Sequence, residues 1–124
     1  MAKYFTVEEA NELVQIIRPL MIQLLELRQS IQEKQPESLA AVEKASGNGG
    51  NKAASKIALE FVTMESLVQA IQGTGAILKD LNNGLVDFLS LREGREVYLC
   101  WQYGEGEIQY WHEIESGYSG RQPL

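Results

Sequence analysis

Apolar residues recur with a helical period over the first 73 residues of this 124-residue chain. One series has alternating spacings of three and four, and it consists of Ala10, Leu13, Ile17, Leu20, Leu24, Leu27 and Ile31. A second series has the same alternation, and it consists of Ala54, Ile57, Phe61, Met64, Val68 and Ile71. Such seams are typical of helices that pack along one another as in a coiled coil. We therefore predict helices over 6–34 and 52–73, arranged as a long antiparallel hairpin.

The start of the first helix carries a capping signal. Thr6 can accept a hydrogen bond from a free N–H of the first turn, and Glu9 can reach back to the N–H of Thr6. Pro19 lies inside the pattern, where it removes one backbone hydrogen bond and predicts a kink near Gln15. Because the seam continues in phase across Pro19, the pattern favours one bent helix over two separate helices.

The stretch 35–51 is predicted to be a flexible connection. Residues 37–45, after Pro36, could form a short additional helix. The glycine-rich run at 47–50 is interpreted as a solvated loop, because no Lys-Ser/Thr pair follows it as a phosphate-binding loop requires. Asn51 could cap the second helix and Gly73 could end it.

From Ala76 onward the apolar pattern changes from a helical period to short alternating runs. Two runs flank Asn83-Gly84, which is a strong hairpin signal, and two more flank the glycine-containing stretch 103–106. The pattern predicts a small four-stranded antiparallel sheet made of two β-hairpins over 76–113, followed by a tail at 114–124. The expected fold is α+β, with one domain spanning 1–124.

The register of the second hairpin decides which side chains meet. A two-residue turn at 104–105 pairs Val97 with His112 and separates apolar from polar positions well. This preferred register places Cys100 and His112 on opposite faces of the sheet. A three-residue turn would bring them to the same face.

Composition and charge limit the function. The chain is 44% hydrophobic and 23% charged, which excludes a wholly disordered protein. Its net charge of −6 is unfavourable for nucleic-acid binding, and no apolar run approaches eighteen residues. A single cysteine cannot form an internal disulfide, so we expect a cytoplasmic protein that binds no nucleic acid, membrane or cofactor.

Four segments of the chain carry a resemblance to a known family. They are Phe5-Thr6-x-x-Glu9-Ala10-Asn11, Lys79-Asp80…Gly84-Leu85-Val86-Asp87-Phe88, Leu99-Cys100-Trp101…Gly104-Glu105…Tyr110-Trp111-His112, and Gly117-Tyr118-x-Gly120-Arg121. Together they resemble DUF2203, a bacterial and archaeal family of unknown function. The resemblance covers nearly the whole chain and is weakest from about residue 35 to 51. It implies a compact domain of this shape and supplies no reaction or ligand.

Two carboxylates are expected to meet across the first hairpin. Asp80 and Asp87 share a face around Asn83-Gly84, and like charges in that position destabilise a sheet by up to about 1 kcal/mol. We expect Arg121 to fold back and neutralise the pair, because the glycines around it let the tail turn across the sheet. We favour a structural role for Asp87, in which it anchors the tail or caps the turn, and a functional carboxylate pair is the alternative.

Cys100 and His112 are weak candidates for zinc ligands, together with Asp87, Glu105 or Glu115. They are also candidates for a Cys-His nucleophilic pair. Neither a CxxC nor an HxxxH spacing supports a metal, and the preferred register separates the two side chains. We therefore predict no metal site and a buried, unreactive Cys100.

Aromatic residues gather in the last third of the chain. The preferred register places Trp101 and Trp111 on opposite faces, so one of them should lie on the more exposed side. An exposed tryptophan near His112 and Arg121 would suit a ligand or partner surface.

Two functional hypotheses follow. The first is a homodimeric binding module of unknown role, with a protein or small-molecule partner and an aromatic, carboxylate-rich site on the sheet. Its candidate binding residues are Asp80, Asp87, Trp101, Glu105, Trp111, His112 and Arg121. The dimer would form through the first helix, whose apolar stripe is wider than one helix can cover. The alternative is an enzyme, hydrolase-like or metal-assisted, that uses Asp87, His112 and Arg121.

Overall fold

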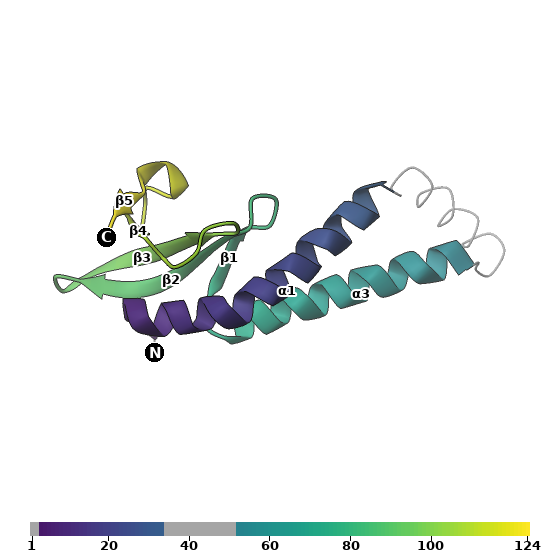
Figure 1. Cartoon of the computed structure of the whole chain (residues 1–124), viewed down its shortest axis with the longest axis horizontal. Helices are drawn as coiled ribbons and strands as arrows, with labels where there is room; N and C mark the ends of the chain where they lie inside the picture. Colours follow the sequence, from purple (N-terminus) through teal and green to yellow (C-terminus); the bar gives the residue numbers. More distant parts are fainter. Residues whose placement is uncertain (1–2, 34–51) are drawn as a thin grey trace.

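A computed structural model describes residues 3–33 and 52–124. The described residues form two long helices and an antiparallel sheet of five strands, which is an α+β fold (Figure 1). The helices are α1 (Val7–Glu33) and α3 (Lys52–Gly73). The strands, with one short 3-10 helix, are β1 (Ile77–Asp80), β2 (Leu85–Arg92), β3 (Arg95–Gln102), β4 (Tyr110–Glu113), η1 (Tyr118–Gly120) and β5 (Gln122–Pro123).

Helix α1 begins with the predicted capping box. The backbone N–H of Thr6 donates to Oε1 of Glu9 at 2.9 Å, and the N–H of Glu9 donates to Oγ1 of Thr6 at 3.1 Å. These hydrogen bonds lower the pKa of the Glu9 carboxyl group. The helix continues through Pro19, and its axis bends along its course (Figure 1). One bent helix is therefore confirmed.

The two helices lie side by side and pack against each other (Figure 1). On α3 the seam agrees with the prediction at Ile57, Met64, Val68 and Ile71, and it differs from the prediction at Phe61. Phe61 is half exposed, whereas Leu67 is buried. Leu67 therefore joins the inward-facing positions of α3, and Phe61 leaves them. The connection at 35–51, with its possible helix at 37–45 and its glycine-rich run at 47–50, lies outside the described residues.

The sheet has the strand order β1-β2-β3-β4-β5. Strands β2 and β3 form its longest hairpin, with pairs from Leu85↔Gln102 to Arg92↔Arg95. Glu93 and Gly94 close it with φ angles of 54° and 78°, as a two-residue turn of type I′ requires. The prediction of four strands was wrong by one. The tail supplies β5, which pairs with β4 through only two residues.

The first predicted hairpin contains a β-bulge that changes its register. Asp87 pairs with Ile77, and Asp80 pairs with Leu85. The expected Asp80–Asp87 pair is therefore not formed. Asp80 instead accepts hydrogen bonds from the backbone N–H of Asn83 at 3.3 Å and from its side-chain amide at 2.7 Å. These bonds, the side-chain one foremost, lower the pKa of Asp80.

The hairpin between β3 and β4 is offset by one residue from the preferred register. Tyr98 pairs with His112, and Cys100 pairs with Tyr110. Cross-strand partners share a face, so Cys100 and His112 lie on the same face, and the expected separation was wrong. The connecting loop comprises residues 103–109. Its odd number of residues gives a register in which Cys100 and His112 share a face, whereas the expected two-residue turn separates them.

Specific contacts fix this loop. The indole N–H of Trp101 donates to the backbone carbonyls of Glu105 and Gly106 at 3.2 and 3.1 Å. The backbone N–H of Ile108 donates to Oδ1 of Asn11 on α1 at 2.7 Å. The loop is therefore held by a core tryptophan and by a helix distant in sequence. A local turn rule could not anticipate either contact.

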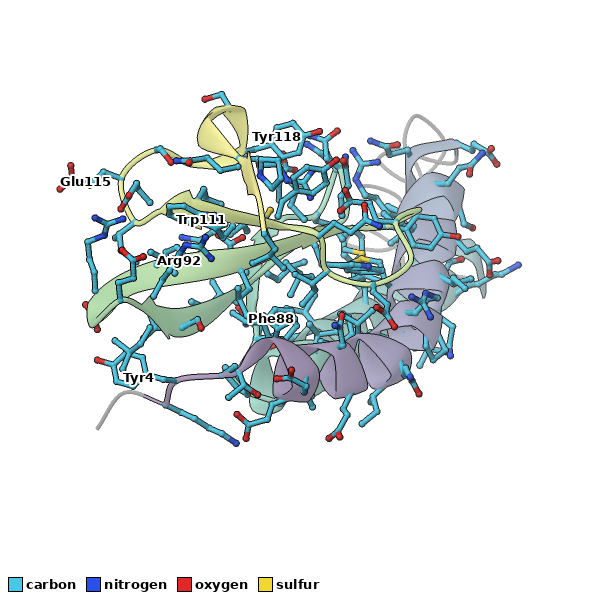
Figure 2. The ribbon with its side chains drawn as sticks, turned by 60° about the vertical axis from the view of Figure 1, so that its left-hand side comes forward. Tyr4, Phe88, Arg92, Trp111, Glu115 and Tyr118 are labelled. Carbon is cyan, nitrogen blue, oxygen red and sulfur yellow. The ribbon has the colours of Figure 1, made fainter. Side chains whose placement is uncertain are left out.

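One face of the sheet packs on the helices and forms the core. Trp101 is fully buried there and Trp111 is 7% exposed, so both tryptophans belong to the core and the expectation of one exposed tryptophan was wrong. Figure 2 shows Phe88 between the sheet and α1, with Tyr118 on the opposite side of the sheet. Among the described helices, none combines the length and apolar character needed to cross a membrane.

Candidate functional site

Three polar side chains are buried side by side on the outer face of the sheet. Asp87 comes from β2, Cys100 from β3 and His112 from β4, and their exposed fractions are 3%, 1% and 2%. The carboxylate, sulfur and imidazole atoms that could bind a metal all lie within 4.8 Å of one another. We call these three residues the Asp-Cys-His cluster.

The strand pairing brings the cluster together. Asp87 and Cys100 are direct cross-strand partners. His112 pairs with Tyr98, two residues before Cys100, so it lies diagonally across from Cys100. Direct and diagonal neighbours on one face are close enough for side chains to touch. The one-residue offset of β4 therefore creates the cluster.

Both ring nitrogens of His112 face oxygen atoms. Nδ1 lies 2.8 Å from the backbone carbonyl oxygen of Glu113. Nε2 lies 3.1 and 3.2 Å from the two carboxylate oxygens of Asp87. Either nitrogen can be donor or acceptor according to the tautomer, but a neutral imidazole has only one N–H to donate.

Cys100 is a neutral thiol in this environment. Burial, followed by the negative charge of Asp87, raises the pKa of Cys100 from 9.0 to about 12. A nucleophilic cysteine needs a lowered pKa or a base within hydrogen-bond reach. Because both nitrogens of His112 face other acceptors, the geometry does not support a Cys-His nucleophilic pair.

The cluster opens into a pocket of about 100 Å³. The tail contributes Gly117 and Tyr118 to its walls, and β1 contributes Lys79. The ammonium group of Lys79 lies 4.8 Å from the ring centre of Tyr98, next to His112 on this face.

Arg121 holds the tail across the sheet. One of its terminal nitrogens donates to both carboxylate oxygens of Glu105, at 2.7 and 2.9 Å. Its guanidinium group also lies 4.1 Å from the ring centre of Tyr110 and 4.8 Å from that of Tyr118. We call the Glu105–Arg121 ion pair with these two rings the tail latch.

The environment of Arg121 favours its charged form. Burial alone would lower the pKa of Arg121, but the hydrogen bond with Glu105 and nearby negative charge raise it overall. Arg121 folds back as expected, yet its carboxylate partner is Glu105 and not the Asp80–Asp87 pair. The latch fixes Tyr118 at the pocket, because η1 lies directly before Arg121.

The predicted site residues thus fall into three groups. Asp87, Cys100 and His112 form the cluster. Glu105 and Arg121 form the latch beside it. Of the remaining candidates, Asp80 ends β1 and accepts hydrogen bonds from Asn83, and Trp101 and Trp111 lie in the core. Lys79 and Tyr118, which also line the pocket, were not predicted as site residues, although Tyr118 stands in the quoted Gly-Tyr-x-Gly-Arg segment.

Fold and site together define a small α+β domain with a buried Asp-Cys-His cluster on the outer face of its sheet. Residues 3–124 match the family described as "Uncharacterized conserved protein (DUF2203)". The chain therefore belongs to this family, and the resemblance drawn from its motifs is confirmed. Comparison with curated proteins gave no match, and neither did comparison with solved structures.

Proposed function

We propose that this protein is a small binding module, and that its ligand occupies the pocket over Asp87, Cys100 and His112. One observation carries the proposal. Three buried polar side chains from three different strands open into a single pocket. Burying polar groups costs free energy unless they find partners, so such a cluster is more expected at a binding site than in a purely structural sheet.

The size of the pocket restricts the ligand. A volume of about 100 Å³ is well below the roughly 300–1,000 Å³ of pockets that bind drug-sized ligands. The ligand is therefore an ion, or a small polar group of a larger molecule. Acidic, thiol and imidazole groups at the base of the pocket, with Lys79 on its wall, suit a charged ligand.

The geometry gives less support to the enzyme hypothesis. That hypothesis requires Asp87, His112 and Arg121 in one cleft. Asp87 and His112 do meet, but Arg121 is bound to Glu105 and is outside the pocket lining. The pKa of Cys100 is raised to about 12, by burial and then by the negative charge of Asp87, so its thiol is not activated as a nucleophile. Binding is therefore the better supported function.

We also propose that the protein is a homodimer, with the two helices joined as an antiparallel hairpin in a single domain. On α1, Val14 and Met21 are buried within the monomer, so these two residues leave less apolar surface on α1 for a dimer interface than the sequence suggests. The larger apolar exposure is on α3, where Leu59, Phe61 and Val62 are 66%, 50% and 60% exposed. Sedimentation at tens of micromolar should give a dimer if this surface forms an interface of standard size.

The proposed pocket can be tested by NMR. Zinc ions, inorganic phosphate and acetate are titrated separately into ¹⁵N-labelled protein purified with a chelator. We expect at least one probe to shift the amide signals of Cys100 and His112 in a saturable way. The signals of Leu59 and Val62 on α3 serve as the internal control. If no probe shifts the signals around the pocket more than those of α3, the proposed function is wrong.

A further inference from the structure

A neutral His112 cannot donate a hydrogen bond to both of the oxygen groups that its ring nitrogens face. If Nδ1 carries the proton and donates to the carbonyl of Glu113 at 2.8 Å, Nε2 presents a lone pair to the carboxylate of Asp87 at 3.1 Å. Two acceptors then face each other inside a buried site, which is unfavourable. A positive charge between them removes the mismatch. A second proton on His112 or a metal ion between the two groups would provide it.

The spacing of the cluster fits a small metal ion. Zinc binds nitrogen and oxygen at about 2.0 Å and sulfur at about 2.3 Å, so tetrahedral ligand atoms lie roughly 3.3 to 3.6 Å apart. The Nε2 to carboxylate distances of 3.1 and 3.2 Å are close to this value. No pair of ligand atoms in the cluster is more than 4.8 Å apart. The most distant ligand atoms must therefore approach each other by about 1 Å to reach the spacing of a tetrahedral zinc site, and a side-chain rotation can supply this movement.

The types of ligand select the class of metal. Thiolate and imidazole bind borderline and soft metal ions, whereas magnesium and calcium prefer all-oxygen sites. One carboxylate, one thiolate and one imidazole are the ligand types that zinc uses in proteins. Three protein ligands leave a fourth position free, as in zinc sites that bind water or a substrate group. All three residues line the pocket, so the pocket can supply the fourth ligand.

The surroundings of His112 also match those of a metal ligand. A metal-binding histidine usually donates its other ring N–H to a carbonyl or carboxylate, which fixes the tautomer and the ring orientation. The carbonyl of Glu113 occupies that place for Nδ1, which leaves Nε2 as the atom that faces the cluster. The hydrogen bonding of His112, the spacing of the ligand atoms and the adjoining pocket are therefore all consistent with a bound metal ion.

We propose that Asp87, Cys100 and His112 bind one zinc-class divalent metal ion, with a fourth ligand supplied from the pocket. This inference rests on the proposed function, because it names the ligand of the same pocket. On binding, the Sγ–H bond of Cys100 breaks, its proton passes to solvent, and a metal–sulfur bond forms. The two positive charges of the metal balance one carboxylate and one thiolate, so the buried site is neutral. Lys79 on the pocket wall favours water or a small anion as the fourth ligand.

The test uses zinc and cobalt with the whole chain after treatment with a chelator. Zinc affinity is measured by competition with a chromophoric chelator, and Co²⁺ is added in a parallel titration. We expect one zinc per chain, and a cobalt complex with visible bands of tetrahedral type and a near-ultraviolet thiolate-to-cobalt band. The thiolate band reports Cys100 in the unaltered protein, because it is the only cysteine in the chain.

Variants identify the ligands. Cys100→Ser and His112→Gln should each weaken zinc binding by more than about 100-fold, since losing even a residue that orients a ligand costs roughly 10–100-fold. Asp80→Asn is the matched control, because Asp80 is a carboxylate on the same hairpin that serves Asn83 and not the cluster. It should leave zinc affinity unchanged. Circular dichroism verifies that each variant is folded.

The outcomes separate this inference from the proposed function. Stoichiometric zinc binding with a thiolate band, lost in folded Cys100→Ser, supports it. Zinc binding that persists in Cys100→Ser, or cobalt binding without a thiolate band, overturns the metal site. If zinc fails to bind while phosphate or acetate shifts the Cys100 and His112 signals, the metal is wrong and the pocket stands. If none of the probes reaches those signals, both proposals fall.

Discussion

The tail latch gives a quantitative prediction about stability. Arg121 and Glu105 form a largely buried ion pair, with side chains that are 11% and 22% exposed. A hydrogen bond to a charged group contributes about 1.5–3 kcal/mol when it is shielded from water. We therefore expect a coupling free energy of about 2 kcal/mol between these residues, measured by urea unfolding of Arg121→Ala, Glu105→Gln and the double variant.

The chain contains a matched control for this measurement. Arg95 and Glu113 form an ion pair at 2.6 Å, close to the 2.7 Å of the latch, but their side chains are 60% and 40% exposed. Exposed pairs contribute only about 0.2–1 kcal/mol. The same cycle on Arg95→Ala and Glu113→Gln should give a smaller coupling than the latch.

The cycle also tests how the tail is positioned. Arg121→Ala should lose stability beyond the ion pair, because its contacts with the rings of Tyr110 and Tyr118 contribute about 0.5–1 kcal/mol each. A latch coupling equal to or below that of the exposed pair would refute the argument. Additive losses in Arg121→Ala and Glu105→Gln would do the same.

Three further predictions concern the cluster and the core. In metal-free protein at pH 8, Cys100 should react with iodoacetamide at least about 100-fold more slowly than after unfolding, because its raised pKa keeps the thiol neutral. Fast labelling of the folded protein would contradict this prediction. Leu24→Ala should cost about 2–5 kcal/mol, since Leu24 is fully buried, whereas Leu91→Ala, at a 50% exposed position outside the proposed dimer surface, should cost less. Fluorescence of Trp101 and Trp111 should resist iodide quenching in the folded chain, and efficient quenching would place one of them outside the core.

The elements with strong local signals were predictable. The capping box at Thr6 and Glu9 and the helical seams follow from spacing alone, and the structure confirms both helices near their expected ends. The in-phase seam was enough to favour one helix through Pro19. These features depend on residues close together in sequence, which is why pattern and propensity identified them.

Strand registers were not predictable in the same way. The bulge in β1 and the odd-numbered loop before β4 each shift the pairing by one residue, and a one-residue shift moves a side chain to the other face. The contact that helps fix the loop joins Ile108 to Asn11, 97 residues away. Such a contact leaves no local trace in the sequence.

The observed strand registers changed which residues of the candidate site lie together. Cys100 and His112 were treated as weak metal ligands because the preferred register separated them. The observed register brings them together with Asp87. It also sends both tryptophans into the core, which removes the expected aromatic binding surface. The candidate residues could therefore be named from the sequence, whereas their grouping required the structure.

The central proposal is that Asp87, Cys100 and His112 on the outer face of this sheet bind one zinc-class metal ion. X-ray absorption at the zinc edge of the zinc-loaded protein tests it most directly. The account predicts one sulfur at about 2.3 Å and nitrogen or oxygen ligands at about 2.0 Å. A shell of nitrogen and oxygen alone, with no sulfur, would contradict it.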